Sequence, residues 1–594
     1  MPAARLPRLD LPGSVAATVL LCLSFTPSLL PRSWFVQGVV GGLCAATGYA
    51  LGCLPRLVLP RWRAGGRAWS LFASAAVPST ILAACQGWRW QQQVSAMVGV
   101  DGPSAMTWVG ALPTAAAVFA ALLAVAGLVR RGGRATFPVR EHRPSPAGLA
   151  LRDGRPAPVG LAPRNLRSAP VRLAPPGRWS GTTGLIPEGR WSGTAGLALR
   201  GRWSGTTGLA LRGRRHPAAA TLVVLALLVC MQPLGALSTL LDSRVTDLAA
   251  PAEATRSGSP ASLVPWATLG REGRAFVTGA LAVRHARPPI RVYVGLRTAS
   301  TSKERARLAV AELQRTGAFA RQVLCLVIPT GSGWIDEPTL AALEDTFDGD
   351  TAVAAIQYSA LPSWLSLAAE PERAETAAGD LIDEVRRGWS AMPATTRPKL
   401  LVYGHSLGAR AVQAPFGSVD RLLDEVDGAL ISGPPSTGPL RERLLAGRSP
   451  ASTEIAPALP GRPDIRFATG LAGLSTAGGT AYPRVVFLQH ATDPVVWWSP
   501  GLLSHRPDWL RERRGDGVLP QVRWWPIVTF WQVSGDLLTA QDVPAGHGHR
   551  YGAEAGAAWR LLTGTGWSSW TRQERLPPGP GGDAIGGAWS SASR

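Results

Sequence analysis

The stretch Leu400-Leu-Val-Tyr-Gly-His-Ser-Leu-Gly408 runs from an apolar strand pattern directly into a Gly-x-Ser-x-Gly turn. At its centre, Ser406 can act as a nucleophile only if a base takes its proton and the turn holds it clear of the sheet. Gly404 and Gly408 allow the backbone to reverse sharply there. Residues 409–416 can begin a helix whose first amides face developing negative charge. The stretch therefore predicts a nucleophile elbow, with a buried turn serine as the alternative.

Strand and helix patterns alternate around this elbow. Further strands are predicted at 290–296, 322–328, 351–358, 427–432 and 485–490, and helices at 303–316, 339–347 and 375–392. This alternation predicts an α/β fold with a mostly parallel sheet and helices on both faces. Active sites in such sheets lie beyond the carboxyl ends of the strands.

An acid and a histidine follow the elbow in the chain order of an α/β-hydrolase triad. Asp493 comes directly after the strand at 485–490, where its carboxylate could orient an imidazole; capping an Asp-Pro turn is the alternative. His547 and His549 lie in a glycine-rich loop near the C-terminus. We favour His549 as the general base with His547 supporting it, although the sequence leaves their order open. No third ligand accompanies the two histidines, so neither a metal nor another cofactor is predicted.

Backbone amides must also face the oxygen that becomes negative during acyl transfer. One is expected from Leu407, directly after the nucleophile. The other is expected from the loop Pro329-Thr-Gly-Ser-Gly-Trp334, whose glycines allow close backbone approach. Thr330 and Gly331 are the favoured donors in this loop. A simple strand-to-helix turn is the alternative.

The C-terminal half is rich in tryptophan and contains several further histidines. Candidates for lining a substrate pocket are Trp334, Trp498 and Trp525, with ordinary core packing as the alternative. His405, within the elbow, is expected to pack away from the site, and His490 and His505 are expected to be structural.

Five uncharged stretches are long enough to cross the hydrocarbon core of a membrane, which takes about 20 helical residues. They are 11–31, 33–55, 68–88, 102–129 and 217–241. We therefore predict a transmembrane region of four helices over 1–129 and a fifth helix at 218–241. Arginines are concentrated after the second and fourth stretches, and positively charged loops stay in the cytoplasm. The N-terminus is accordingly expected in the cytoplasm and the C-terminal half outside.

The net charge of +22 first suggests a nucleic-acid partner, but its distribution argues against one. Residues 130–217 contain 17 Arg and 3 acidic residues, whereas residues 218–594 contain 36 basic and 34 acidic residues. The arginine-rich stretch contains 12-residue repeats that begin at Gly177, Gly189 and Gly201. We predict a disordered cytoplasmic loop, with contact between its Arg and Trp residues and anionic lipid as the alternative.

Several longer motifs resemble one known family. They are P-T-G-S-G-W from Pro329, Q-Y-S-A-L-P-S-W-L-S from Gln357, G-H-S-L-G from Gly404, Gly433-Pro-Pro435, L-Q-H-A-T-D-P-V-V-W-W-S-P from Leu488, G-H-G-H-R-Y from Gly546 and S-F-T-P-S-L-L-P-R-S-W from Ser24. With the apolar N-terminal half, they resemble the actinobacterial membrane-anchored α/β-hydrolase family. The resemblance implies the α/β-hydrolase fold and supports Ser406, Asp493 and one of the two histidines as the triad. It implies no substrate.

The predicted organisation places an α/β-hydrolase domain at 288–576, after a linker or pre-domain at 242–287 and before a disordered tail at 577–594. The predicted function is that of an integral membrane serine hydrolase, of the esterase or lipase type, with an acyl ester as substrate. A lipid or a cell-envelope component is the expected ester. The alternatives are an acyltransferase with the same triad and a non-catalytic scaffold or transport accessory that keeps the fold as a binding module.

Overall fold

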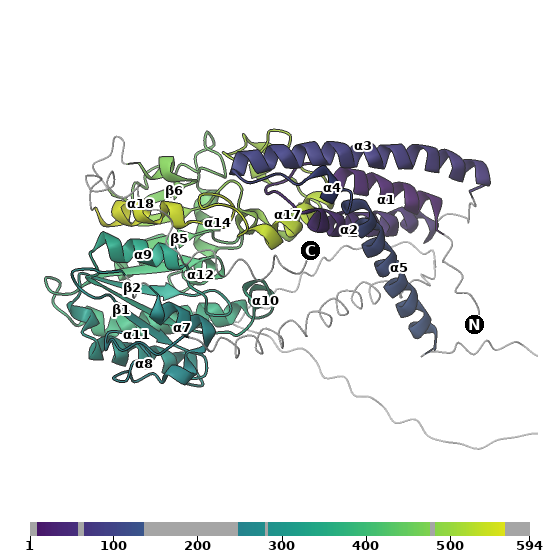
Figure 1. The fold of residues 1–594 in the computed structure, drawn as a ribbon. Helices are drawn as coiled ribbons and strands as arrows, with labels where there is room; N and C mark the ends of the chain where they lie inside the picture. Colours follow the sequence, from purple (N-terminus) through teal and green to yellow (C-terminus); the bar gives the residue numbers. More distant parts are fainter. Residues whose placement is uncertain (1–8, 58–63, 136–247, 280–282, 476–481, 565–594) are drawn as a thin grey trace, which may run out of the picture. The chain divides into compact units, whose positions relative to one another are not determined.

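The computed structural model describes residues 9–57, 64–135, 248–279, 283–475 and 482–564. These residues include a seven-stranded sheet of order β1-β3-β2-β4-β5-β7-β6, in which every neighbouring pair is parallel (Figure 1). The strands are β1 Ile290–Val294, β2 Val323–Ile328, β3 Thr351–Ile356, β4 Lys399–His405, β5 Gly428–Ser432, β6 Ile465–Ala468 and β7 Val485–Leu488. The predicted α/β class and parallel strand direction are confirmed.

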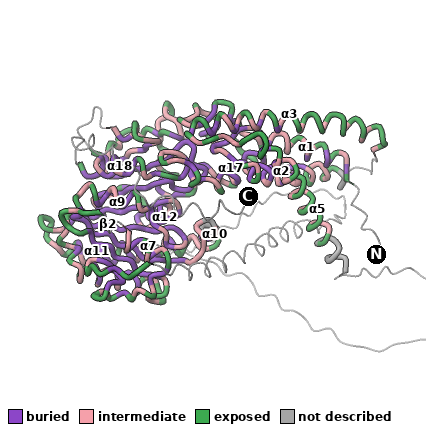
Figure 2. Tube along the Cα trace, viewed as in Figure 1, coloured by how far each residue is buried: buried purple, intermediate pink, exposed green. Residues whose placement is uncertain are grey.

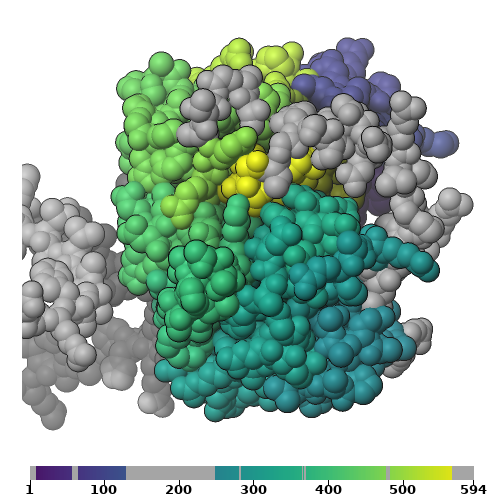
Figure 3. Space-filling model, turned by 90° about the vertical axis from the view of Figure 1, so that its left-hand side faces the viewer, coloured from purple at the N-terminus to yellow at the C-terminus, as the bar shows by residue number. Residues whose placement is uncertain are grey.

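Helices cover both faces of this sheet. α8 (Ser302–Arg315) and α11 (Pro371–Ser390) pack together on one face, and α9 (Glu337–Thr346) and α18 (Gly552–Thr563) pack together on the other (Figure 1). Because both faces are covered, the strands consist mainly of buried apolar residues. In the space-filling view, C-terminal residues coloured yellow emerge between the teal and the green parts of the domain (Figure 3).

The strand order reverses at β2, and this reversal decides where a site can form. β3 follows β2 on one side, and β4 then returns to the other side of β2. The loops that leave β2 and β4 therefore lead to helices on opposite faces, α9 and α12 (Leu407–Ala411). Ligands of open parallel sheets bind beyond the carboxyl ends of strands at such a switch point.

The structure adds elements that the sequence pattern did not predict. β6 has four residues and includes Arg466, so it is too short and too polar to show a strand pattern. α8 begins at Ser302 because Thr301 and Glu304 form a capping box. The short helices that were not predicted are α7 Gly270–Thr278, α10 Ser363–Ala369, α13 Val419–Glu425, α14 Pro439–Ala446, α15 Pro494–Trp497, α16 Asp508–Arg511 and α17 Val528–Asp536. Short 3-10 helices are η2 Trp266–Thr268, η3 Ala318–Ala320, η4 Leu471–Leu474, η5 Pro500–Leu503 and η6 Leu537–Thr539.

The described part of the predicted linker, 242–287, contains packed structure. α7 packs on β1 and buries its Phe276 and Val277. Arg256 pairs with Arg291 of β1 in a parallel bridge, and its guanidinium donates to Val277 O (2.8 Å). The sheet domain, as we call the described residues from 253 to 564, therefore begins before residue 288.

The N-terminal region is helical, with α1 Leu11–Ser24, α2 Trp34–Cys53, η1 Leu54–Leu57, α3 Gly66–Val98, α4 Ala105–Trp108 and α5 Ala111–Ala135. Among the described residues, three stretches are long and apolar enough to cross a membrane: Trp34–Cys53, Gly66–Val98 and Ala105–Leu128. The predicted stretch 11–31 forms only a 14-residue helix, because the chain leaves the helix at Ser24, before Pro27 and Pro31. The predicted fifth helix, the repeats and the tail lie outside the described residues.

α2 is the best covered of these helices. A Cβ at Gly42 would lie 2.6 Å from Val118 of α5, and one at Gly52 would lie 2.5 Å from Pro12 O of α1. Such small residues allow close approach of neighbouring helices, as in membrane helix pairs. In contrast, α3 exposes most residues over the greater part of its length (Figure 2).

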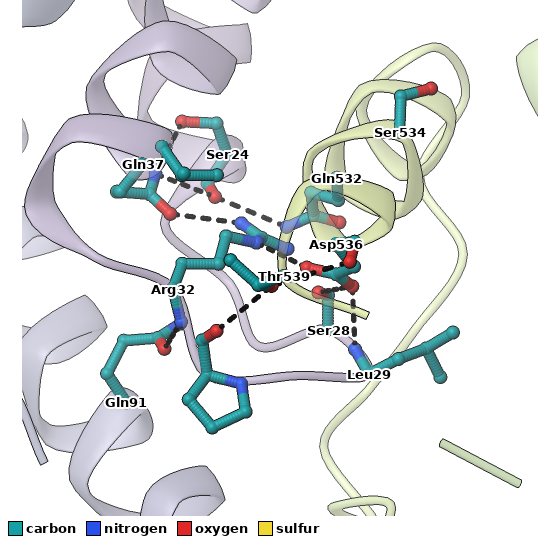
Figure 4. Close-up of polar contacts among 12 residues, drawn as sticks. Ser24, Ser28, Leu29, Arg32, Gln37, Gln91, Gln532, Ser534, Asp536 and Thr539 are labelled. Atoms are coloured by element: carbon teal, nitrogen blue, oxygen red, sulfur yellow. Dashed lines mark hydrogen bonds and ion pairs between the residues drawn. The ribbon is translucent and has the colours of Figure 1, made fainter. Parts of the chain in front are cut away.

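The loop between α1 and α2 joins the N-terminal helices to the sheet domain. Arg32 and Asp536, at the end of α17, form an ion pair of 2.7 Å with both side chains fully buried (Figure 4). Asp536 also accepts from the Ser28 hydroxyl and from Leu29 N–H (3.1 Å). Arg32 donates to Gln37 Oε1 (3.0 Å), so the pair is held within a larger polar network.

α17 also lies along α2. A Cβ at Gly535 would lie 2.5 Å from Val40, and Trp531 Nε1 donates to Thr47 Oγ1 (3.2 Å). Leu29 and Leu30 share an apolar cluster with residues of the segment after β7, Val496 and Trp497. A segment of the sheet domain and the N-terminal helices therefore share one core.

Candidate active site

Ser406 lies in the sharp turn between β4 and α12. Its backbone has φ 56° and ψ −124°, a region that residues with side chains rarely adopt. A Cβ at Gly404 would lie 2.4 Å from Gly408 O, and one at Gly408 would lie 2.0 Å from Ile328 O. Both positions therefore require glycine. Ser406 N–H donates to Ser432 O at the end of β5 (3.0 Å), which fixes the turn beside the neighbouring strand.

Asp493 follows β7 and caps α15, fully buried. Its Oδ2 lies 2.7 Å from His549 Nδ1 and accepts from the Tyr551 hydroxyl (2.6 Å), while Oδ1 accepts from Val495 N–H (2.8 Å). Because an ionised carboxylate only accepts, the proton of a neutral His549 lies on Nδ1. Its Nε2 then carries a lone pair and has no hydrogen-bond partner among the described residues.

The His549 imidazole lies directly beside the elbow. Its ring centre is 4.3 Å from that of His405, the residue before Ser406. On another side, a Cβ at Gly433 would lie 2.6 Å from His549 Cε1, and Gly433 itself has φ 56°. Since Gly433 follows the residue that holds Ser406 N–H, the turn and the imidazole are fixed to the same strand end.

The loop that carries His549 is tied to the loop that carries Asp493. Gly548 N–H donates to Thr492 Oγ1 (2.9 Å), and His490 Nδ1 lies 2.8 Å from Gly548 O. A carbonyl oxygen only accepts, so Nδ1 of His490 carries its proton. His549 N–H donates to Ala540 O (2.8 Å), just after η6. These bonds set the distance between acid and imidazole.

The other predicted histidines take different positions. His547 is half-buried, its N–H donates to Pro544 O, and no described hydrogen bond joins it to Asp493. Burial lowers the pKa of His547 below its usual value. His490 stacks on Tyr551 with ring centres 4.0 Å apart, and His505 is exposed beside Ser504.

The two predicted amide sources lie next to each other at the switch point. Leu407 is the first residue of α12, so its N–H has no acceptor within the helix. Thr330 N–H donates to Trp334 O (2.9 Å), whereas Gly331 N–H makes a longer contact with Ser363 Oγ (3.3 Å). In this loop Gly331 is the amide that a substrate oxygen could take over more readily.

The three tryptophans that were predicted to line a substrate pocket lie in three different environments. Trp334 packs edge-on against His405, with ring centres 5.5 Å apart. Trp498 donates from Nε1 to Ser534 Oγ on α17 (2.8 Å). Trp525 packs on the apolar cluster that includes Val36 and Val40 of α2. Only Trp334 contacts the group around Ser406 through a ring contact that the structure shows.

Tyr551 is the main feature of this site that the sequence analysis missed. It is fully buried, and its hydroxyl donates to Asp493 and accepts from His490 N–H (3.0 Å). Burial first, and then the Asp493 charge, raise the pKa of Tyr551 well above 10, so the hydroxyl stays a donor. The available signal was its place two residues after His549 in G-H-G-H-R-Y.

His405→Leu is expected to flatten the acid dependence of stability. The His405 ring lies against His549 and so does not pack away from the site. Burial, with His549 and His490 nearby, lowers the pKa of His405 well below 6.5, and neither ring nitrogen has a hydrogen-bond partner among the described residues. As the pH falls, the unfolded chain therefore binds a proton at a higher pH than the native chain does. This difference lowers the free energy of unfolding by about 2 kcal/mol between pH 6.5 and 5. Urea unfolding in detergent at both pH values measures the difference. An unchanged pH slope in His405→Leu would contradict it.

No group of three or more His, Cys, Asp or Glu side chains that could hold a metal occurs in the part of the chain that the structure describes. The profile of an α/β-hydrolase family matches residues 290–576, and the profile of the same family's N-terminus matches residues 25–150 and 218–280. The chain belongs to this α/β-hydrolase family.

The matched ranges of the α/β-hydrolase family include the sheet from β1 to β7 and the N-terminal helices from α2 to α5, so both regions are parts of the family's architecture. Among solved structures, an acetylxylan esterase is similar at 14% identity and a TM-score of 0.19, over 30% of this chain and 86% of that chain. A likeness at this level says nothing about the activity of this α/β-hydrolase. The comparison with curated proteins found no match.

Proposed function

We propose that the chain is a membrane-anchored serine hydrolase that acts on an acyl ester. Ser406 attacks the ester carbonyl, His549 takes the serine proton and then gives it to the leaving alcohol, and Asp493 orients the imidazole. The N–H groups of Leu407 and Gly331 stabilise the tetrahedral oxygen. A water that reaches the acyl-enzyme completes hydrolysis, whereas an alcohol in its place would give acyl transfer.

One observation carries the proposal. The hydrogen bond between Asp493 and His549 leaves Nε2 of a buried imidazole with a lone pair, beside a serine that the backbone holds in a strained turn. Buried His405 also lacks hydrogen-bond partners among the described residues, but only His549 has a carboxylate on Nδ1 that fixes its tautomer. Strain at a non-glycine residue persists where the surrounding structure enforces it, and such strain concentrates at functional sites.

Membrane anchoring rests on the three apolar stretches of the N-terminal region. We propose that they span the bilayer together with the two further predicted crossings at 11–31 and 217–241, with the N-terminus in the cytoplasm and the sheet domain outside. Arginine-rich segments at 56–67 and 130–217 support this orientation. A site next to the bilayer favours an ester with lipid-like character, such as a lipid or an envelope component.

Protease added to intact spheroplasts is expected to cleave the sheet domain. If the sheet domain is protected, the proposed orientation is wrong.

A fluorophosphonate probe tests the serine chemistry. We expect the full-length protein in detergent to be labelled covalently, and peptide mapping to place the adduct on Ser406. Heat-denatured protein should stay unlabelled, because the reaction needs the assembled site. A folded wild-type protein that stays unlabelled would support the non-catalytic binding module instead.

Tyr551→Phe is expected to lower kcat/KM for ester hydrolysis by about tenfold to a hundredfold. The change removes one charge-assisted hydrogen bond to Asp493, a loss of about 1.5 to 3 kcal/mol. It also leaves the buried His490 N–H without its acceptor. Tyr482→Phe, on an exposed tyrosine, serves as the matched control. Steady-state kinetics with a p-nitrophenyl ester measure the effect, and wild-type kinetics in Tyr551→Phe would contradict the assigned contact.

A further inference from the structure

A second candidate binding site lies in the segment between α15 and α17. It is a hollow of about 320 Å³ lined by Arg506, Arg514, Pro520, Arg523, Trp524 and Trp525. None of the residues placed beside Ser406 lines it. The hollow is therefore separate from the chemistry described above and needs its own explanation.

The charges around this hollow are uncompensated. Arg514 donates to backbone carbonyl oxygens, among them Val522 O (2.9 Å), and Arg506 donates to Leu510 O (2.6 Å). None of its three arginines has an ion pair among the described residues. Burial and the two neighbouring arginines lower the pKa of Arg514. Three positive charges, two of them held by backbone oxygens, suit an anion, and the guanidinium fork matches a phosphate.

The three arginine side chains differ in their exposure to solvent. Arg506 and Arg523 are exposed, whereas Arg514 is half-buried and fixed by its carbonyl partners. Arg514 thus supplies a preorganised charge in the lining of the hollow. Arg506 would give up its hydrogen bonds to Leu510 O to reach a ligand, but neither Arg506 nor Arg523 would break an ion pair with a described residue.

The aromatic wall connects the hollow to the N-terminal helices. Trp525 packs on the cluster that contains Val36, Val40 and Cys44 of α2, a helix long and apolar enough to span a membrane. Trp524 Nε1 donates to Leu502 O (3.0 Å), which fixes its ring. Leu503, which follows Leu502 in the chain, exposes 39% of its surface. Tryptophan, leucine and arginine together are typical of segments at the membrane interface.

We propose that this hollow binds the phosphate of an anionic lipid head group in the leaflet beside the sheet domain. The lipid source rests on the membrane placement proposed above, because Trp525 brings the hollow next to α2. Free phosphate would meet the same guanidinium groups but would leave the indole wall unused. A head group would use both, with its acyl chains alongside α2.

The test is binding of fluorescent phosphatidylglycerol to the full-length protein in detergent. Arg506→Gln/Arg523→Gln is compared with Arg511→Gln/Arg513→Gln, which removes the same charge from exposed arginines that do not line the hollow. Each arginine near a membrane surface contributes about 1 kcal/mol, so we expect about fivefold weaker binding per residue and about 25-fold for the double variant. The control pair should bind within about twofold of wild type.

Three outcomes would overturn the proposal. They are equal losses in the two double variants, equal binding of fluorescent phosphatidylcholine by the wild type, and displacement of the labelled lipid by inorganic phosphate at low millimolar concentration. Equal losses in the two double variants would show general charge attraction. Displacement by inorganic phosphate would show a site for soluble phosphate. Fluorophosphonate labelling of the wild type in the same detergent reports on the serine chemistry, so failure of one proposal is distinguishable from failure of the other.

Discussion

Ser406→Ala is expected to lower kcat for ester hydrolysis by about 10⁴- to 10⁶-fold, the range found when a triad nucleophile is removed. The residual rate comes from the amides of Leu407 and Gly331 and from substrate binding, which do not need the hydroxyl. KM should change little, because the serine makes its decisive interaction in the transition state. A p-nitrophenyl ester assay, with burst kinetics on the wild type, measures both constants.

The triad assignment also predicts how the changes combine. Ser406→Ala/His549→Ala should be no slower than Ser406→Ala alone, because the imidazole has no proton to take once the hydroxyl is gone. Ser504→Ala changes an exposed serine of the same domain and should keep the wild-type rate. Multiplicative losses in the double variant would show that His549 acts independently of Ser406, and would remove it from the triad.

Asp536→Ala is expected to destabilise the protein by about 3 to 5 kcal/mol, the usual cost of breaking a buried ion pair from one side. The change leaves the Arg32 guanidinium buried without a carboxylate, and it frees the Ser28 hydroxyl and Leu29 N–H as well. Urea unfolding of the full-length protein in detergent measures the loss. Fluorophosphonate labelling of the same variant should be slower, since Leu29 and Leu30 share a cluster with Val496 and Trp497 beside the Asp493 loop.

Two further variants distinguish the effect of an unpaired buried charge from a general loss of packing. Arg32→Met/Asp536→Leu removes both charges and fills similar volume, so most of the lost stability should return. Arg511→Ala breaks an ion pair of 3.6 Å that is exposed at both ends, and it should cost less than about 1 kcal/mol. A wild-type unfolding curve for Asp536→Ala would mean that the contact between α17 and the first loop contributes little.

Local patterns in the sequence were sufficient for every strand except β6, and for the turn after β4. Apolar runs predicted β2, β4 and β7, because a parallel strand buried on both faces must be apolar along its length, although the predicted β7 extends two residues past Leu488. Asp493 was predicted from its place at a strand end, and the structure puts it beside His549. The strand ends and the elbow depend on residues within a few positions of each other, whereas Asp493 and His549 are 56 positions apart and were linked only by their order in the chain.

Contacts between distant residues could not be predicted in the same way. The sequence analysis predicted no contact for Arg32, whereas the structure buries it against Asp536, 504 positions away. The bond from Tyr551 to Asp493 crosses 58 positions. The short α1 was also missed, because an apolar run shows where a helix could extend and not where a buried loop replaces it.

Because the loop between α1 and α2 pairs with α17, the order of synthesis limits the order in which the protein can fold. Synthesis at about 5 to 20 residues per second separates Arg32 from Asp536 by roughly 25 to 100 s. During that interval an unpaired guanidinium strongly disfavours burial, so the loop stays in water. It can close only when nearly the whole chain has been made. The acid and base loops contribute to the same apolar cluster as Leu29 and Leu30, so they should be among the last parts of the chain to assemble.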